Sequence, residues 1–210
     1  NPCEEQNDGS TPLMGAIAKN QQHITHWLLE QHAVRETLNH KNIAEETALT
    51  VAIKNNKPGI VSLLLAAGSS IENYKAINAA IEANDIECLK ILILHKSDLV
   101  SSLVKYDKMR VFENAAKKES HNFLLTLFKN DPEFIATKEI LFAAARSSVE
   151  TLNFLLNHHE WPTEELSEAI YYATAGRKIE CVKLLHAKGA TLNYIFRGTG
   201  WSSLELASRN

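Results

Sequence analysis

The feature that most constrains the fold of this chain is an internal repeat. A Leu, Ile or Phe followed three residues later by Ala recurs at intervals of 28 to 36 residues. The recurring pairs are Leu13/Ala16, Leu49/Ala52, Ile77/Ala80, Phe112/Ala115, Ile140/Ala143, Ile170/Ala173 and Leu204/Ala207. After most of these pairs comes a second apolar run. A period of about 30 residues predicts a solenoid of stacked repeats, in which each repeat packs only on its neighbours.

Each repeat is predicted to contain two short helices joined by a tight turn. Residues three apart share one helix face, and a small Ala lets the next helix approach closely. The first helices are expected at residues 12–19, 48–55, 76–83, 111–118, 139–146 and 169–175. We therefore predict an all-α fold that forms one elongated domain over residues 1–210, with repeats starting near residues 11, 47, 75, 110, 138, 168 and 202.

The residues at the helix ends agree with this pattern. Asn20, Asn56 and Asn84 occupy the equivalent turn position, where Asn tolerates a left-handed backbone better than most residues do. Gly68 and Gly189 follow second helices, where a helix C-terminus favours Gly.

Composition limits the classes of function. The net charge is −3, so no basic surplus points to nucleic acid, and no apolar run is long enough to predict a membrane span. Cys3, Cys88 and Cys181 are an odd, widely spaced set and do not form a disulfide framework. Cys88 and Cys181 fall at the same place in two second helices, so we expect small buried hydrophobic residues and a reducing, cytoplasmic compartment. Because the chain does not begin with Met and stops within a seventh repeat, we expect a fragment of a longer monomeric protein.

Several stretches resemble the ankyrin repeat. The segments 10–13, 46–49 and 201–207 are similar to its Thr-Pro-Leu-His-x-Ala opening, and 63–72 and 184–193 are similar to its close. The resemblance covers residues 8–210; repeats one, two, six and seven match well, and repeats three to five match in helix pattern only. It implies a protein-binding module whose contacts lie on the concave surface of the first helices and on the fingers between repeats.

The departures from the family pattern carry further expectations. The His of the motif is absent from every repeat, with Thr50 and Glu205 among its replacements, so the usual Thr–His hydrogen bond is missing. Glu119, Ser147 and Arg177 replace the turn residue in repeats four to six. Two spacings of 28 residues are too short for full β-hairpin fingers, so the fingers should be irregular. This degenerate pattern is similar to that of ankyrin arrays in effector proteins of intracellular bacteria, which implies secretion into a host cell.

No motif for catalysis, a cofactor or a metal is found. His158 and His159 are adjacent and point in different directions, while His23 and His26 share a face, and no Cys or carboxylate stands at zinc-site spacing around either pair. Surface histidines are the favoured interpretation. The cysteines lie within apolar stripes and are not expected to act as nucleophiles. The segment 198–200 lacks the Gly and Lys of a phosphate loop and is predicted to be a turn.

The tryptophans divide between packing and binding. Trp27 lies in the apolar run of a second helix, and we expect it in the core. Trp201 precedes the motif of the last repeat and is interpreted as structural. Trp161 lies in the loop between repeats five and six, where either an exposed partner contact or packing of the loop fits its position.

The candidate binding residues lie at the ends of the first helices, which in the resembled family face the concave groove. They are Lys19, Lys54, Asn55, Glu82, Lys117, Lys118 and Arg146. Cations at helix ends can simply be solvated and favoured by the helix dipole. Alternatively, they form a patch that meets an acidic segment of a partner or host protein.

Three classes of function remain open. The first is a protein-binding module, and the second is the substrate-targeting region of a larger enzyme whose catalytic domain lies outside this sequence. The third is a structural spacer without a partner.

Overall fold

The computed structural model describes residues 8–118, 121–198 and 200–209. Over these residues the chain is helical and contains no β-strand; one isolated antiparallel bridge joins Ile195 and Ser202. The predicted all-α architecture of stacked helix pairs with irregular fingers is confirmed. The chain divides into two compact halves, Asn1–Leu103 and Val104–Asn210, and each is described by itself.

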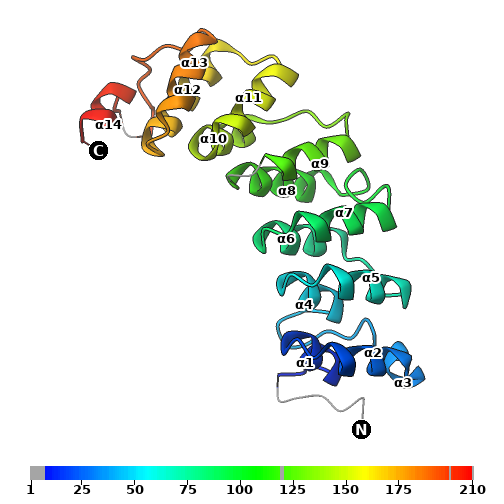
Figure 1. Cartoon of the computed structure of the whole chain (residues 1–210). Helices are drawn as coiled ribbons and strands as arrows, with labels where there is room; N and C mark the ends of the chain where they lie inside the picture. The colour runs from blue at the N-terminus through cyan, green and yellow to red at the C-terminus, as the bar shows by residue number, and fades with distance from the viewer. Residues whose placement is uncertain (1–7, 119–120, 199, 210) are drawn as a thin grey trace. The chain divides into compact units, whose positions relative to one another are not determined.

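The N-terminal half places its first helices in one layer and its second helices in another. Its helices are α1 (Pro12–Ala18), α2 (Gln22–Glu30), α3 (His32–Glu36), α4 (Ala48–Lys54), α5 (Pro58–Ala66), α6 (Asn73–Glu82) and α7 (Ile86–His95). The first helices pack in the order α1, α4, α6, and α5 packs on α7 beside them (Figure 1). The short α3 follows α2 in the loop toward α4 and has no counterpart in the predicted repeat.

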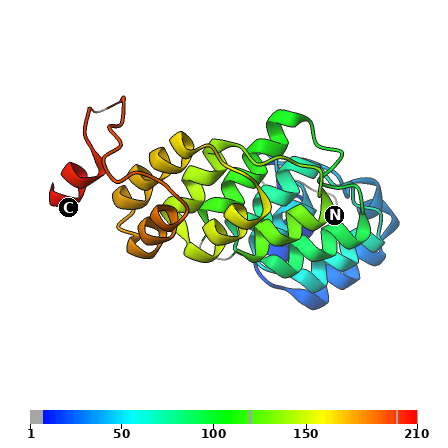
Figure 2. The same ribbon diagram turned by 90° about the horizontal axis from the view of Figure 1, so that it is seen from above.

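The C-terminal half repeats the same two layers. Its helices are α8 (Lys105–Lys117), α9 (Asn122–Asn130), α10 (Lys138–Ser147), α11 (Val149–His158), α12 (Thr163–Ala175), α13 (Ile179–Ala187) and α14 (Ser203–Arg209). Helix α10 packs between α8 and α12, α11 packs on α13, and α14 packs on α12. The loop over residues 188–198 projects from these helices before the chain enters α14, drawn in red in Figure 2.

The predicted first helices are all present, but three of them begin three to six residues earlier than expected. Helices α6, α8 and α12 begin at residues 73, 105 and 163 instead of 76, 111 and 169. In α8 the additional turns are mostly polar, and its buried residues start only at Val111. The apolar pair therefore marks the buried part of each first helix and does not show where the helix starts.

The inner turns follow the prediction wherever Asn is present. Asn20, Asn56 and Asn84 have φ values of 56°, 54° and 55°, in the left-handed region. Arg177 adopts the same conformation, with φ of 55°. Between α10 and α11 the chain instead passes through the extended Ser148, whose hydroxyl accepts a hydrogen bond from the Thr151 amide as the N-cap of α11. The replacement at Glu119 lies outside the described residues.

The helix caps show what replaces the missing His of the motif. The Thr47 and Thr50 side chains each accept a hydrogen bond from the other residue's backbone amide at the start of α4, which is a capping box. Ser202 and Glu205 make the same reciprocal arrangement at α14. At α4 and α14, therefore, the residue that stands at the motif's His position fixes the start of the helix by accepting a hydrogen bond from the backbone amide of the N-cap residue.

The core lies between neighbouring helix pairs, and its chemistry differs between the halves. In the N-terminal half the largest fully buried side chains are aliphatic, such as Leu49, Leu64 and Ile77. The C-terminal half buries Phe112 and Phe123 and contains all seven phenylalanines of the chain. Burial of Cys88 and Cys181 confirms the prediction for both residues.

Three packing predictions are wrong. Trp27 is 55% exposed because α2 turns Thr25, Leu28 and Leu29 toward the core, so residue 27 points away from it. Leu204 is 55% exposed, and Ala207 is exposed with it, because the stacking face of α14 is not covered by a further helix among the described residues.

The third wrong prediction concerns α10. Ala143 is only half-buried, because α10 buries Ala144 and Ala145 in its place.

Candidate functional site

The candidate residues of the N-terminal half lie at the ends of α1, α4 and α6, as predicted. Lys19 is the exposed C-cap of α1, and Glu82 is the exposed last residue of α6. Lys54 ends α4, and its Nζ lies 2.6 Å from Oε1 of Glu46, a carboxylate in the loop before α4. The side chain of Asn55 donates to the Val51 carbonyl at 2.8 Å and closes the helix. The positive charge at this end is therefore partly compensated.

Electrostatics in the same half follow from these pairs. The hydrogen bond from Lys54 lowers the pKa of Glu46. A second network, which the sequence did not predict, ties the loop before α4 to the start of α6: Lys41 Nζ lies 2.5 Å from Glu72 Oε1, and Lys75 Nζ lies 3.3 Å from Glu72 Oε2. The Lys41 hydrogen bond lowers the pKa of Glu72. Exposed pairs of this kind order loops more than they stabilise the fold.

The candidate residues of the C-terminal half lie at the ends of α8 and α10 and in the loop after α11. Lys117 is the last residue of α8 and pairs with Glu113 at 2.7 Å, and Lys118 is the C-cap of the same helix. Arg146 lies exposed one residue before the end of α10. Trp161 is half-buried, and its indole N–H donates to the Leu155 carbonyl at 3.3 Å.

Two of these residues, Lys117 and Arg146, line one hollow of about 620 Å³ on the first-helix side of the C-terminal half. We call it the α10 hollow; it is lined by Glu113, Lys117, Glu139, Phe142, Ala143, Arg146, Ser147, Tyr172 and Lys178. Phe142 and Tyr172 stack with their ring centroids 4.6 Å apart and their planes 15° apart. The half-buried Ala143 leaves the space that a larger side chain would fill. The hollow therefore combines an apolar aromatic surface with cations from three helix ends.

Sequence reasoning missed most of the α10 hollow, although a signal was present. Glu139, Phe142 and Arg146 are spaced by three and four residues along α10 and therefore share one helix face. Tyr172 and Lys178 come from α12 and from the turn before α13, and only packing of these elements on α10 brings them to the same place.

The cysteines and histidines form no reactive centre among the described residues. Both described cysteines are buried, and desolvation raises the pKa of the Cys88 thiol and raises that of Cys181 to about 11. No group of three His, Cys, Asp or Glu side chains gathers in ligating positions over residues 8–118, 121–198 and 200–209.

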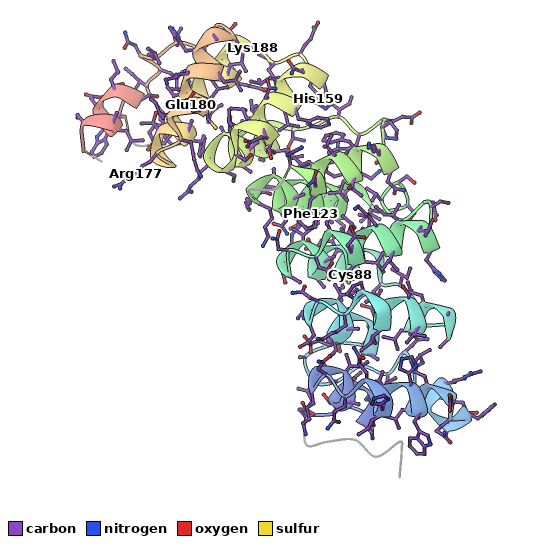
Figure 3. All side chains as sticks on the ribbon, in the orientation of Figure 1. Cys88, Phe123, His159, Arg177, Glu180 and Lys188 are labelled. Atoms are coloured by element: carbon purple, nitrogen blue, oxygen red, sulfur yellow. The ribbon has the colours of Figure 1, made fainter. Side chains whose placement is uncertain are left out.

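The adjacent histidines make different contacts. Nδ1 of His158 lies 2.8 Å from the Phe154 carbonyl, and the ring of His159, labelled in Figure 3, has its centroid 5.5 Å from that of Phe128 and 6.1 Å from that of Trp161. The prediction of a surface histidine is wrong for His159, which is half-buried because it packs against these aromatic rings. Over the described part of the chain, every helix is too short or too polar to cross a bilayer.

Comparison with known proteins agrees with this architecture. Residues 1–75 match the family model described as ankyrin repeats in three copies. Among solved structures, the crystal structure of the human ASB11 ankyrin repeat domain superposes with a TM-score of 0.73 at 18% identity, over 94% of this chain and 92% of that one. No curated protein matches the chain in sequence. Together with the stacked helix pairs and the repeated motif, these matches show that the chain has the ankyrin-repeat fold and that residues 1–75 match the ankyrin-repeat family in sequence.

Proposed function

We propose that this chain is a protein-binding module whose first-helix ends take up an acidic segment of a partner protein. Ankyrin repeats are generally protein–protein interaction modules. The observation that carries the more specific proposal is the α10 hollow, where Lys117, Arg146 and Lys178 surround an apolar floor.

The balance of charge favours an acidic partner at this hollow. The hollow is lined by the cations Lys117, Arg146 and Lys178 and by the carboxylates Glu113 and Glu139, so its lining carries one more positive than negative charge. Arg146 makes no ion pair with another described residue, so its guanidinium is available for a carboxylate. A local positive surface on a chain of net charge −3 would steer an acidic segment toward it, and association would be faster at low salt.

The N-terminal half offers a weaker version of the same surface. Lys19 is exposed at the end of α1, but Lys54 is already paired with Glu46, and Glu82 adds a negative charge at the end of α6. We therefore assign the stronger share of acidic-partner recognition to the C-terminal half.

The proposal is tested by charge reversal in each half separately. The full chain serves as bait to identify a partner, and binding of that partner is then measured for Lys54→Glu and for the double variant Lys117→Glu/Arg146→Glu. The control is Lys90→Glu/Lys183→Glu on the second helices. These lysines are exposed and paired with Glu87 and Glu180 at 2.7 and 2.8 Å, much as Lys117 is paired with Glu113.

We expect the double variant to lose most binding, Lys54→Glu to lose less, and the control to bind normally. Salt should weaken wild-type binding and have little effect on the double variant. Equal loss in the double variant and in the control, or loss in the control alone, would place the binding surface on the second helices and contradict the proposal.

A further inference from the structure

The α10 hollow has an internal organisation that a general basic surface lacks. One side consists of the stacked Phe142 and Tyr172 rings with the half-buried Ala143 beside them. The other side carries Arg146 and Lys178. The equivalent alanines of the five other first helices that have a neighbour on each side or begin the array, Ala16, Ala52, Ala80, Ala115 and Ala173, are buried, and Ala207 on the last helix α14 is exposed. Ala143 differs from the five buried alanines because its small side chain lines a hollow.

The aromatic side of the hollow is packed against a further ring, that of Phe196. The Phe196 ring, which comes from the loop before α14, lies in a T-shaped arrangement with Tyr172, the centroids 5.8 Å apart and the planes 82° apart. Phe196 also stacks on Tyr171 at 4.3 Å. Tyr172 is thus fixed between Phe142 and Phe196, so a ligand would meet a preformed surface and would not have to order it.

The cationic side is also held in place. A Cβ placed on Gly176 would lie 2.8 Å from the Arg146 carbonyl oxygen and 2.9 Å from its Cγ. The φ of Gly176 is −80°, so glycine is needed here for close approach of α12 to α10 and not for an unusual backbone conformation. The stem of Arg146 therefore rests against the Gly176 backbone, which restricts the directions that the guanidinium can take.

We propose that the α10 hollow is an anchor pocket for a linear acidic peptide that carries one large apolar side chain next to its carboxylates. The apolar side chain packs on Phe142, Ala143 and Tyr172, and a neighbouring carboxylate pairs with Arg146. The charge of Lys178, which lines the same side, adds to the positive potential around Arg146. This inference rests on the proposed protein-binding function and names the kind of segment that this function would recognise.

Synthetic capped peptides test the pocket with the complete chain. The probe is Glu-Glu-Phe-Glu-Glu with a fluorescent label, and its two controls replace the Phe with Ala or all Glu with Gln. We expect the probe to bind and each control peptide to bind at least about tenfold more weakly, since a tenfold change corresponds to about 1.4 kcal/mol, the scale of one lost charge-assisted or apolar contact.

Variants of the protein separate the two sides of the pocket. Ala143→Leu fills the space beside the rings at a half-buried position and should abolish the preference for Phe over Ala while leaving the preference for Glu over Gln. Arg146→Glu should abolish the preference for Glu over Gln while leaving the preference for Phe over Ala. Gly176→Ala should displace Arg146 and weaken the Glu preference alone, and Lys183→Glu on α13 is the control that should change neither preference. Circular dichroism and thermal melting check that each variant is folded.

The outcomes distinguish this inference from the proposed function. If the wild-type protein does not bind the probe, or if binding is unaffected by both Ala143→Leu and Arg146→Glu, the pocket assignment is wrong. The proposed function still stands in that case if partner binding falls in the Lys117→Glu/Arg146→Glu variant. If partner binding is unchanged in that double variant but the peptide preferences change as expected in the single variants, the pocket assignment is supported and the proposed function is wrong.

Discussion

The two halves of this chain build the same helix pair from different side chains. The N-terminal half turns through left-handed Asn20, Asn56 and Asn84 and fills its core with aliphatic residues. The C-terminal half contains all the phenylalanines, passes from α10 to α11 through an extended Ser148, and has longer first helices in α8 and α12. The family model matches only residues 1–75, within the N-terminal half.

The difference shows which parts of the repeat the fold requires. Both halves keep a small residue in each first helix and an apolar stripe in each second helix, because helix pairs can stack only where one surface is apolar and allows close approach. The identities of the turn and core residues are less constrained. In the C-terminal half aromatic side chains also line the first-helix surface, where the buried Phe142 stacks on the half-buried Tyr172 at the floor of the α10 hollow.

The largest effect is expected from Phe112→Ala in the C-terminal half. Phe112 is fully buried, and the centroid of its ring lies 4.7 Å from that of Phe128 and 4.1 Å from that of Phe134. Its removal should lower the free energy of unfolding by about 3–5 kcal/mol, through lost burial and the cavity that remains. Urea denaturation measures the change. A loss no larger than that of the exposed control Lys183→Ala would show that the aromatic cluster does not hold this half together.

Leu64→Ala and Leu92→Ala are the corresponding changes in the N-terminal half. Both side chains are fully buried on second helices, so each variant should be destabilised by about 2–5 kcal/mol. The same urea experiment compares them with Phe112→Ala. An unchanged midpoint for both variants would mean that this half does not depend on its aliphatic stripe.

Replacing the turn residue by Ala should lower the free energy of unfolding in both halves, but for a different physical reason in each. Asn56→Ala keeps the Cβ but removes the short polar side chain that makes Asn tolerant of the left-handed region, so at φ of 54° it should lower the free energy of unfolding by about 1 kcal/mol, whereas Asn56→Gly should be close to neutral.

Ser148→Ala should also lower the free energy of unfolding by about 1 kcal/mol, because it removes the hydroxyl that caps the N-terminus of α11. Ser148→Thr, which keeps the hydroxyl, should restore most of that stability. The midpoints of thermal unfolding measure all four variants. If Asn56→Ala were as stable as wild type, the left-handed turn would not explain why Asn stands there.

The smallest effect is a difference in acid sensitivity between the halves. Burial against aromatic rings lowers the pKa of His159 below its ordinary value of 6.5, and its Nε2 is buried without a hydrogen-bond partner among the described residues. Because the folded state disfavours the protonated form, stability is complete above pH 6.5 and falls as the pH drops below it. His159→Gln should reduce this loss, as measured by melting temperature between about pH 7.5 and pH 5.

The N-terminal half should lose stability only in a more acidic range. Hydrogen bonds from lysines lower the pKa values of Glu46 and Glu72 below 4.5, so their contribution is present above pH 4.5 and is lost as the pH falls through their folded-state values. Glu46→Gln should therefore flatten the stability profile below pH 4.5 and leave the range near pH 6 unchanged. An identical profile for wild type and His159→Gln near pH 6 would contradict the role of His159.

The sequence by itself determined the repeat, the all-α helix pairs, the left-handed Asn turns and the buried cysteines. These features depend on local periodicity and backbone preference, which one repeat already contains. It did not determine where α8 and α12 begin, because polar turns before the apolar pair carry no packing signal. Nor could it show that Trp27 is exposed, since only the rotation of α2 on its neighbours decides that. The α10 hollow required the tertiary structure most of all. Its residues come from α8, α10, α12 and the turn before α13, and nothing within one repeat specifies how side chains from neighbouring repeats meet.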